Sequence, residues 1–168
     1  MHRLAVKSLV LLLVTAGPAF AGQSGESASF SGACLLLKVD ESLAYGPSVI
    51  EWGQALYDHG GWSNLDANPT RLTVPSGVSY VVVNMGGEVD KVAGQFNIRD
   101  DINGSDSLTI QTVQQSADSG YGGHVTLTAT TPALPVNAGD YFEYVAGSSG
   151  AATLRQASET YFCIRAVQ

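Results

Sequence analysis

The sequence predicts an all-β fold, a sandwich or barrel of about nine or ten short strands in one domain. Only 14% of the residues are charged, and the chain contains 19 glycines. Thr, Ser, Val and Tyr are also abundant, which is typical of half-buried strands joined by tight turns. Apolar residues alternate with polar ones over short runs, and no stretch has the period of a helix. No internal repeat is visible, which argues against a propeller or solenoid.

The expected strands follow one another from residue 33 to the end of the chain. Residues 33–39 form a nearly continuous apolar run, which suits a buried central strand. Residues 78–85 are the strongest strand, rich in β-branched and aromatic side chains. Asn103-Gly104 favours the type I′ turn of a two-residue hairpin. The other expected features are strands over 49–57, 71–74, 96–98, 108–112, 125–129, 141–145 and 161–167, a turn over 75–77, and a flexible tip over 147–150.

The N-terminus has the three-part layout of a secretory signal peptide. Arg3 and Lys7 are basic, residues 9–16 form an apolar run too short to span a bilayer, and Ala-Phe-Ala ending at Ala21 is a cleavage signal. The alternative is a buried N-terminal strand or helix. We expect a signal peptide over 1–21, a flexible leader over 22–32 and one domain over 33–168. The protein is then secreted, extracellular or periplasmic, without membrane insertion after cleavage.

Charge excludes one class of partner. The chain has 8 Lys and Arg against 15 Asp and Glu, a net charge of −7. Removal of Arg3 and Lys7 with the signal peptide leaves six basic residues against fifteen acidic ones, a net charge of −9. No basic cluster offsets this charge, and an acidic surface repels a phosphate backbone. Nucleic acid is therefore not expected as a partner.

Two cysteines, Cys34 and Cys163, lie near opposite ends of the mature chain. An even number of cysteines in an exported protein suggests a disulfide. The alternatives are two buried free thiols or a bond between chains. Neither cysteine has a second Cys or His nearby, so the spacing does not match a metal site.

Five stretches, in order, resemble C1q-like domains. Tyr-Asp-x-Gly-Gly-Trp at 57–62 and Asn-Pro-Thr-Arg-Leu-Thr-Val-Pro-x-Gly-Val-x-Tyr at 68–80 resemble a Trp-containing loop and the strand–turn–strand that follows it. Ile-Asn-Gly at 102–104 is similar to the family's central hairpin. Val-x-Ala-Gly-Asp-Tyr-Phe-Glu at 136–143 resembles the entry into the penultimate strand, and Thr-Tyr-Phe-Cys-Ile-Arg-Ala-Val at 160–167 resembles the closing strand.

This resemblance covers nearly the whole mature chain and implies a C1q/TNF-like domain, of bacterial or phage type. The implied fold is a jelly-roll β-sandwich of about ten antiparallel strands in two sheets, assembled as a homotrimer. In that topology the first and last strands are neighbours in the inner sheet, which brings Cys34 near Cys163 and implies an intrachain disulfide. It also implies an interface with aromatics from the inner sheet, for which we select Tyr80 and Tyr141.

The residues needed for catalysis or metal binding are missing. The mature chain has two histidines, His59 and His124, and no G-x-S-x-G element, whereas a hydrolase needs a nucleophile, a base and an orienting group. The acidic stretch 100–106 does not match an EF-hand, because Arg99 and Ile110 would occupy ligand positions. We expect no enzyme activity, no cofactor and no metal. An irregular calcium site over 100–106 is the alternative to a solvated hairpin tip.

Two loops are candidates for recognition, because loops carry function when a rigid sandwich positions them. An aromatic face flanked by Asp and Asn suits a sugar ring, and aromatics also dominate protein interfaces. The alternative for the tryptophan is that its ring plugs one end of the sandwich. The candidate ligand-binding residues are Asp58, His59, Trp62 and Asn64 in the first loop and Asp100, Asp101 and Asn103 in the second.

Together these features favour a secreted, non-enzymatic, C1q-like binding module. We expect a homotrimer that presents its loops to a protein or glycan partner. The competing hypothesis is a self-associating structural or surface-coat protein, which would form filaments or sheets without a ligand.

Overall fold

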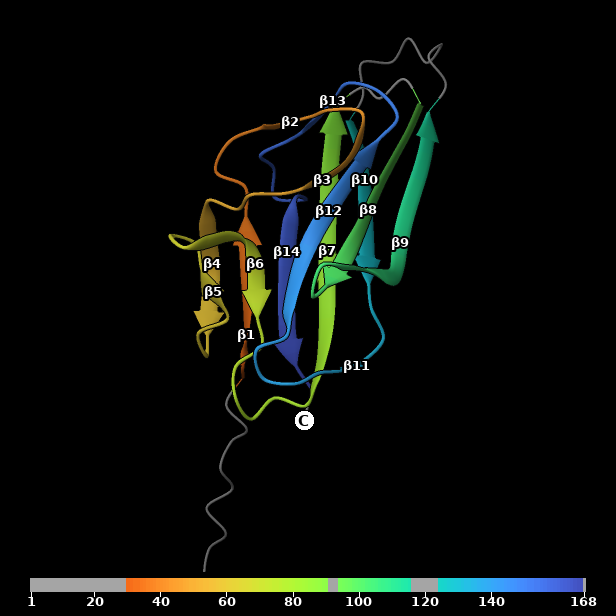
Figure 1. Cartoon of the computed structure of the whole chain (residues 1–168). Coiled ribbons are helices and arrows are strands. Elements are labelled where there is room, and N and C mark those ends of the chain that lie inside the picture. The colour runs from red at the N-terminus through yellow and green to blue at the C-terminus, as the bar shows by residue number, and fades with distance from the viewer. Residues whose placement is uncertain (1–29, 91–93, 116–123, 168) are drawn as a thin grey trace, which may run out of the picture.

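The computed structural model describes residues 30–90, 94–115 and 124–167. Within these ranges the chain is all-β and forms two antiparallel sheets packed face to face as a jelly roll, which confirms the expected fold class (Figure 1). No helix capable of spanning a membrane occurs in this part of the chain. The expected signal peptide, residues 1–21, and most of the expected leader lie outside the described residues.

Sheet A contains the first and last described strands, and its five longer strands run in the spatial order β4-β1-β14-β7-β10. Three short strands extend it: β2 pairs with β13, while β13 and β11 each pair with β7. The strands are β1 (Gly32–Leu36), β2 (Glu41–Leu43), β4 (Gln54–His59), β7 (Tyr80–Asp90), β10 (His124–Thr130), β11 (Leu134–Pro135), β13 (Ala152–Leu154) and β14 (Tyr161–Ala166).

Sheet B packs against sheet A and runs in the order β5-β6-β12-β8-β9. The short strand β3 pairs with the C-terminal half of β12, whereas β6 pairs with its N-terminal half. Figure 1 shows β12 running diagonally across the front of the molecule with β8 beside it. The strands are β3 (Gly46–Val49), β5 (Ser63–Asn64), β6 (Asn68–Thr73), β8 (Gly94–Ile102), β9 (Ser105–Gln115) and β12 (Tyr141–Ser148).

The core fills the space between the sheets because each strand points alternate side chains inward. Phe162 of β14, Tyr144 of β12 and Trp52 of the β3–β4 connection are fully buried and pack as an aromatic cluster. The Trp52 ring meets Tyr144 edge-on at 5.4 Å between centroids and lies stacked against Phe162 at 5.9 Å. This cluster joins both sheets to a connecting segment, so it fixes how the layers sit on each other.

Two sequence expectations need correction. The stretch 49–57 is not one strand, because the chain leaves β3 after Val49 and enters β4 at Gln54. Between them the backbone N–H groups of Ile50 and Trp52 donate to Tyr144 and Pro69, so these two buried side chains belong to a connection. The expected flexible tip over 147–150 is also partly wrong, because β12 continues to Ser148.

The turn and disulfide expectations are confirmed. Asn103 and Gly104 have φ of 53° and 74°, the positive values that a type I′ turn requires, and Ile102 pairs with Ser105 across it. β1 and β14 are antiparallel neighbours, and Cys34 lies directly opposite Cys163. A disulfide joins these two residues across adjacent strands.

Candidate functional site

The first expected recognition loop is held together by its own acidic residue. The Asp58 carboxylate accepts hydrogen bonds from the backbone N–H groups of Gly61 (3.1 Å), Trp62 (2.9 Å) and Ser63 (2.8 Å) and from the Ser63 hydroxyl (2.7 Å). Burial alone would raise the pKa of Asp58, but these hydrogen bonds, led by that from Trp62, outweigh it and lower the pKa below its ordinary value. Asp58 therefore shapes the loop, and its oxygens are already engaged.

Trp62 lies in the core, not on the surface of this loop. Its side chain is 1% exposed, and its indole N–H donates to the Ser31 hydroxyl and the His59 carbonyl, each at 3.2 Å. The ring thus plugs the sandwich and offers no face to a ligand. Asn64 is likewise engaged, since its side-chain oxygen accepts from the Ala67 N–H at 3.2 Å.

The second expected loop is not a solvated hairpin tip with carboxylates exposed to a ligand. β8 continues through Asp100 and Asp101, which are 0% and 7% exposed. Arg99 donates to the Asp101 carboxylate at 2.9 Å, so this carboxylate is paired within the strand. Among the described residues, no cluster of three or more His, Cys, Asp or Glu side chains is arranged to hold a metal ion.

Asn103 joins the β8–β9 hairpin to the turn before β12. Its amide nitrogen donates to Asp140 at 2.9 Å, and its amide oxygen accepts from the Tyr141 N–H at 2.9 Å. The Asn137 backbone N–H also donates to Asp140, and this bond, with that from Asn103, lowers the pKa of the Asp140 carboxyl. The Asn103 side chain therefore connects two turns by hydrogen bonds, and its amide groups are already used within the protein.

The two loops lie at the same end of sheet B. The Thr73 N–H donates to the Trp62 carbonyl, Thr73 pairs with Tyr141, and the Asn103 N–H donates to the Tyr141 carbonyl. The ends of β6 and β12 therefore separate the loops. Of the seven candidate ligand-binding residues, His59 alone combines an exposed side chain with no role in shaping a turn through that side chain.

The two aromatics selected for a subunit interface lie on different sheets. Tyr80 begins β7 of sheet A and is 51% exposed. Tyr141 begins β12 of sheet B, and the Arg71 guanidinium covers its ring at 4.2 Å. Tyr141 therefore does not lie on the inner sheet, contrary to the expectation, whereas Tyr80 does, and its place in a subunit interface stays a prediction.

A different set of side chains forms an apolar surface on the outward side of sheet A, mainly over β4, β1 and β14. Polar Asn84 of β7 and Thr130 of β10, joined by a hydrogen bond, border this surface. In one row across the strands, Tyr57 lies opposite Cys34, and Cys34 lies opposite Cys163. In the next row, Leu36 lies opposite Tyr161. We call this surface the aromatic face; it comprises Phe30, Leu36, Tyr57, Val82, Tyr161 and the disulfide.

Two glycines let the rings of this face lie flat against the sheet. A Cβ atom at Gly86 would come within 2.6 Å of the Tyr161 ring, and one at Gly32 would come within 3.1 Å of the Phe30 ring. Phe30 is 54% exposed and meets Tyr57 edge-on at 5.6 Å between centroids. The absence of a side chain at these two glycines thus leaves space that the rings of the aromatic face occupy.

Charges lie at the two ends of the aromatic face. At one end Arg165 pairs in register with Gly32. At the other, Glu88 and Asp90 contact His124, and Asp90 accepts a hydrogen bond from Arg155 at 2.7 Å. The two central rows contain no charged residue from β1, β14, β7 or β10.

Sequence reasoning missed this face because Tyr57 and Tyr161 sit inside stretches with many buried neighbours. The sequence feature that could have revealed this face is the alternation of these residues with buried neighbours along each strand. Tyr161 and Cys163 alternate with buried Phe162 and Ile164, so they point away from the core.

Comparison with solved structures shows the same fold. Murine APRIL at pH 5.0 is 12% identical and superposes with a TM-score of 0.61, covering 82% of this chain and 99% of its own. Eiger TNF from S. frugiperda is 14% identical with a TM-score of 0.52, covering 83% of this chain and 93% of its own. No protein-family model matches this chain, and no curated protein is significantly similar to it in sequence. These likenesses show a TNF-like jelly roll, while the C1q-like assignment of bacterial or phage type stays a prediction.

Proposed function

We propose that this protein is a secreted, non-enzymatic C1q/TNF-like module that assembles as a homotrimer and binds a protein or glycan partner. The observation that carries the proposal is the aromatic face of sheet A. In an antiparallel sandwich the outward side of a sheet is normally polar. Here the rows over β4, β1 and β14 carry a disulfide, two tyrosines and a leucine, and polar side chains follow only on β7 and β10.

The chemistry of this face fits a contact with another copy of the chain. Interface cores are depleted in charge and enriched in aromatics, and the charges of sheet A lie at the ends of its face. A closed ring of identical subunits buries such a face without leaving an open edge. The TNF-like jelly roll of the solved neighbours supports this arrangement as an analogy of fold.

The test is sedimentation velocity on the mature chain and on variants that place a charge in the face. Phe30, at the border of the face, is 54% exposed, so Phe30→Asp should leave the folded subunit intact. Tyr161→Asp places a carboxylate at the centre of the face, where an unpaired charge in a desolvated contact costs about 3–5 kcal/mol. Both variants should sediment as monomers with native circular dichroism.

Val49→Asp is the matched control, because Val49 is 44% exposed on β3 of sheet B and should stay in the trimer. If both aromatic-face variants remain trimeric, the face is not the interface. If the unmodified chain instead forms species that grow without limit with concentration, the structural or surface-coat hypothesis replaces this proposal.

A further inference from the structure

A hollow on the outward side of sheet B has no role in the assembly proposed above. β8 points Phe96 and Ile98 into the core and points Gln95, Asn97 and Arg99 outward. Its neighbour β12 pairs with β8 on one side and with β3 on the other. The hollow lies over these three strands and encloses about 220 Å³.

The hollow exists because β12 lacks a side chain near its C-terminal end, at Gly147. Gly147 lies opposite Asn97 on β8 and opposite Pro47 on β3. A Cβ at this position would come within 2.6 Å of the Asn97 side-chain oxygen, so the glycine makes room for the Asn97 amide. A glycine in a strand interior often marks a place where another group approaches the backbone.

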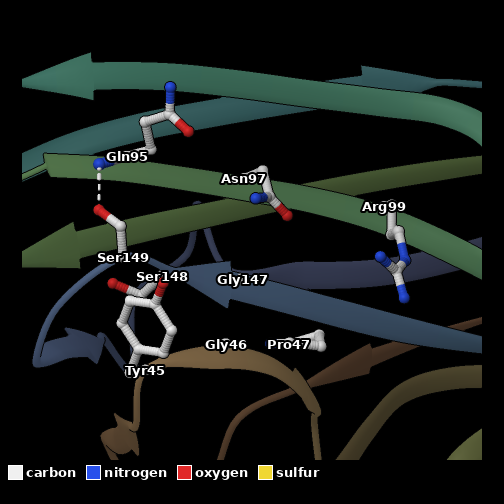
Figure 2. Close-up of a pocket in the computed structure, with 9 residues that line it drawn as sticks. All are labelled: Tyr45, Gly46, Pro47, Gln95, Asn97, Arg99, Gly147, Ser148 and Ser149. Atoms are coloured by element: carbon white, nitrogen blue, oxygen red, sulfur yellow. Dashed lines mark hydrogen bonds between the residues drawn. The ribbon is translucent and has the colours of Figure 1, made fainter.

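An exposed aromatic ring borders this hollow. Tyr45 is 83% exposed, which is the highest exposure of any large apolar side chain in the part of the chain that the structure describes. Gly46 has a φ of +103°, so the chain bends sharply between Tyr45 and Pro47 as it enters β3. Figure 2 shows the tyrosine ring beside Ser148, on the same side of β12 as the outward side chains of β8.

The polar groups around the ring are amides and hydroxyls. The Gln95 backbone N–H donates to the Ser149 hydroxyl at 2.7 Å (Figure 2), and the Ser149 N–H donates to the Gln95 carbonyl at 2.9 Å. The side-chain amide of Asn97 lies over Gly147 and offers a donor and an acceptor to a ligand, whereas the Gln95 amide points away from Tyr45 (Figure 2). Arg99 is paired with Asp101 at 2.9 Å, which neutralises the one cation of the lining.

This combination selects one class of small molecule. A phosphate or carboxylate ligand would require an uncompensated cation, and the lining cation is paired in a chain that is acidic overall. A sugar ring presents an apolar C–H face, which stacks on an aromatic ring, and hydroxyls that both donate and accept hydrogen bonds. Sites for drug-sized ligands occupy about 300–1,000 Å³, so a smaller hollow suits a single ring.

We propose that Tyr45 and Asn97 form a carbohydrate-binding site for one neutral hexose unit of a glycan. Tyr45 stacks against the sugar ring, and the Asn97 amide, which lies over Gly147, forms hydrogen bonds with adjacent hydroxyls of the sugar. The proposal deepens the binding role proposed above by naming the ligand class. The site is complete in one protomer, so it does not depend on the trimer.

The test is saturation-transfer-difference NMR on the purified mature chain. The probes are the methyl glycosides of glucose, galactose, mannose and N-acetylglucosamine. At least one should receive saturation from the protein, and a single ring bound with the efficiency of ordinary small ligands has a Kd of about 1 mM. Lack of transfer to all four overturns the proposal and assigns exposed Tyr45 to a contact with protein instead.

Matched variants place the binding in this hollow. Tyr45→Ala and Asn97→Ala should each weaken binding at least about tenfold, since loss of a stacking contact or a hydrogen-bonded amide is worth about that factor. Tyr45→Phe keeps the ring and should retain most of the affinity. Val49→Ala, at an exposed position of the adjoining strand β3 that does not line the hollow, should bind like the unmodified chain. Equal binding by Tyr45→Ala, or tighter binding of glucose 6-phosphate than of methyl glucoside, contradicts the assignment.

Sedimentation of the same sample separates this proposal from the trimer. If the protein is a monomer and binds the glycoside through Tyr45, the result supports the carbohydrate site and refutes the proposed trimer. A trimer that gives no transfer from any of the four glycosides refutes the site alone.

Discussion

Replacement of Trp62 by alanine tests whether the first loop is part of the core. The ring is 1% exposed, so its removal leaves a cavity that the surrounding sandwich can fill only in part. Truncation of a buried Trp or Phe to Ala costs about 3–5 kcal/mol of unfolding free energy. The loss of the two hydrogen bonds from the indole N–H adds at most about 1 kcal/mol, because Ser31 and the His59 carbonyl lie near solvent.

The measurement is thermal unfolding followed by circular dichroism. For a domain of this size 1 kcal/mol moves the Tm by about 3–4 °C, so Trp62→Ala should melt about 10–20 °C below the unmodified chain. His59→Ala, an exposed neighbour in the same loop, should change the unfolding free energy by less than about 0.5 kcal/mol. A Tm within a few degrees for Trp62→Ala would refute the core position and return the ring to the surface as a recognition element.

Three further outcomes are expected. Replacement of both Cys34 and Cys163 by Ser should cost up to about 5 kcal/mol in urea unfolding, because the bond closes a loop with a sequence separation of 129; an unchanged midpoint contradicts this. The folded-state pKa of Asp58 is lowered, so its stabilising contribution is present above the unfolded pKa of about 3.9 and is lost as pH falls through the lower folded value. Asp58→Asn should therefore flatten the acid limb of the stability curve, and an unchanged limb removes Asp58 as its source. Asn103→Ala should cost about 1–2 kcal/mol, whereas Asn103→Gly should cost less because glycine adopts the positive φ freely; equal losses would mean that backbone conformation is not part of the cost.

The strand pattern and the hairpin were predictable because local chemistry determines them. β7 begins with three consecutive valines after Tyr80 and buries most of its residues, and Asn103-Gly104 can adopt the two positive φ angles of a type I′ turn. The connection between β3 and β4 was not predictable in this way. Trp52 and Ile50 alternate like strand residues, but their backbone bonds go to Pro69 and Tyr144, far away in sequence.

The candidate site was the least predictable part. Asp and Asn beside glycines fit a binding loop and a self-bonded turn equally well, because the same oxygens that accept from a ligand also accept from nearby backbone N–H groups. Asp58 and Asn103 take the second role. Tyr45 shows the converse, since no motif marks it and its exposure depends on how β3 pairs with β12.

Native mass spectrometry of the secreted protein tests the central proposal most directly. The account predicts one dominant species with three times the mass of residues 22–168, each copy lighter by two hydrogens for the bond between Cys34 and Cys163. The same spectrum reports whether the chain begins at Gly22. A single-chain mass that persists as the protein concentration is raised, in a sample with the intact disulfide, would contradict the trimeric module.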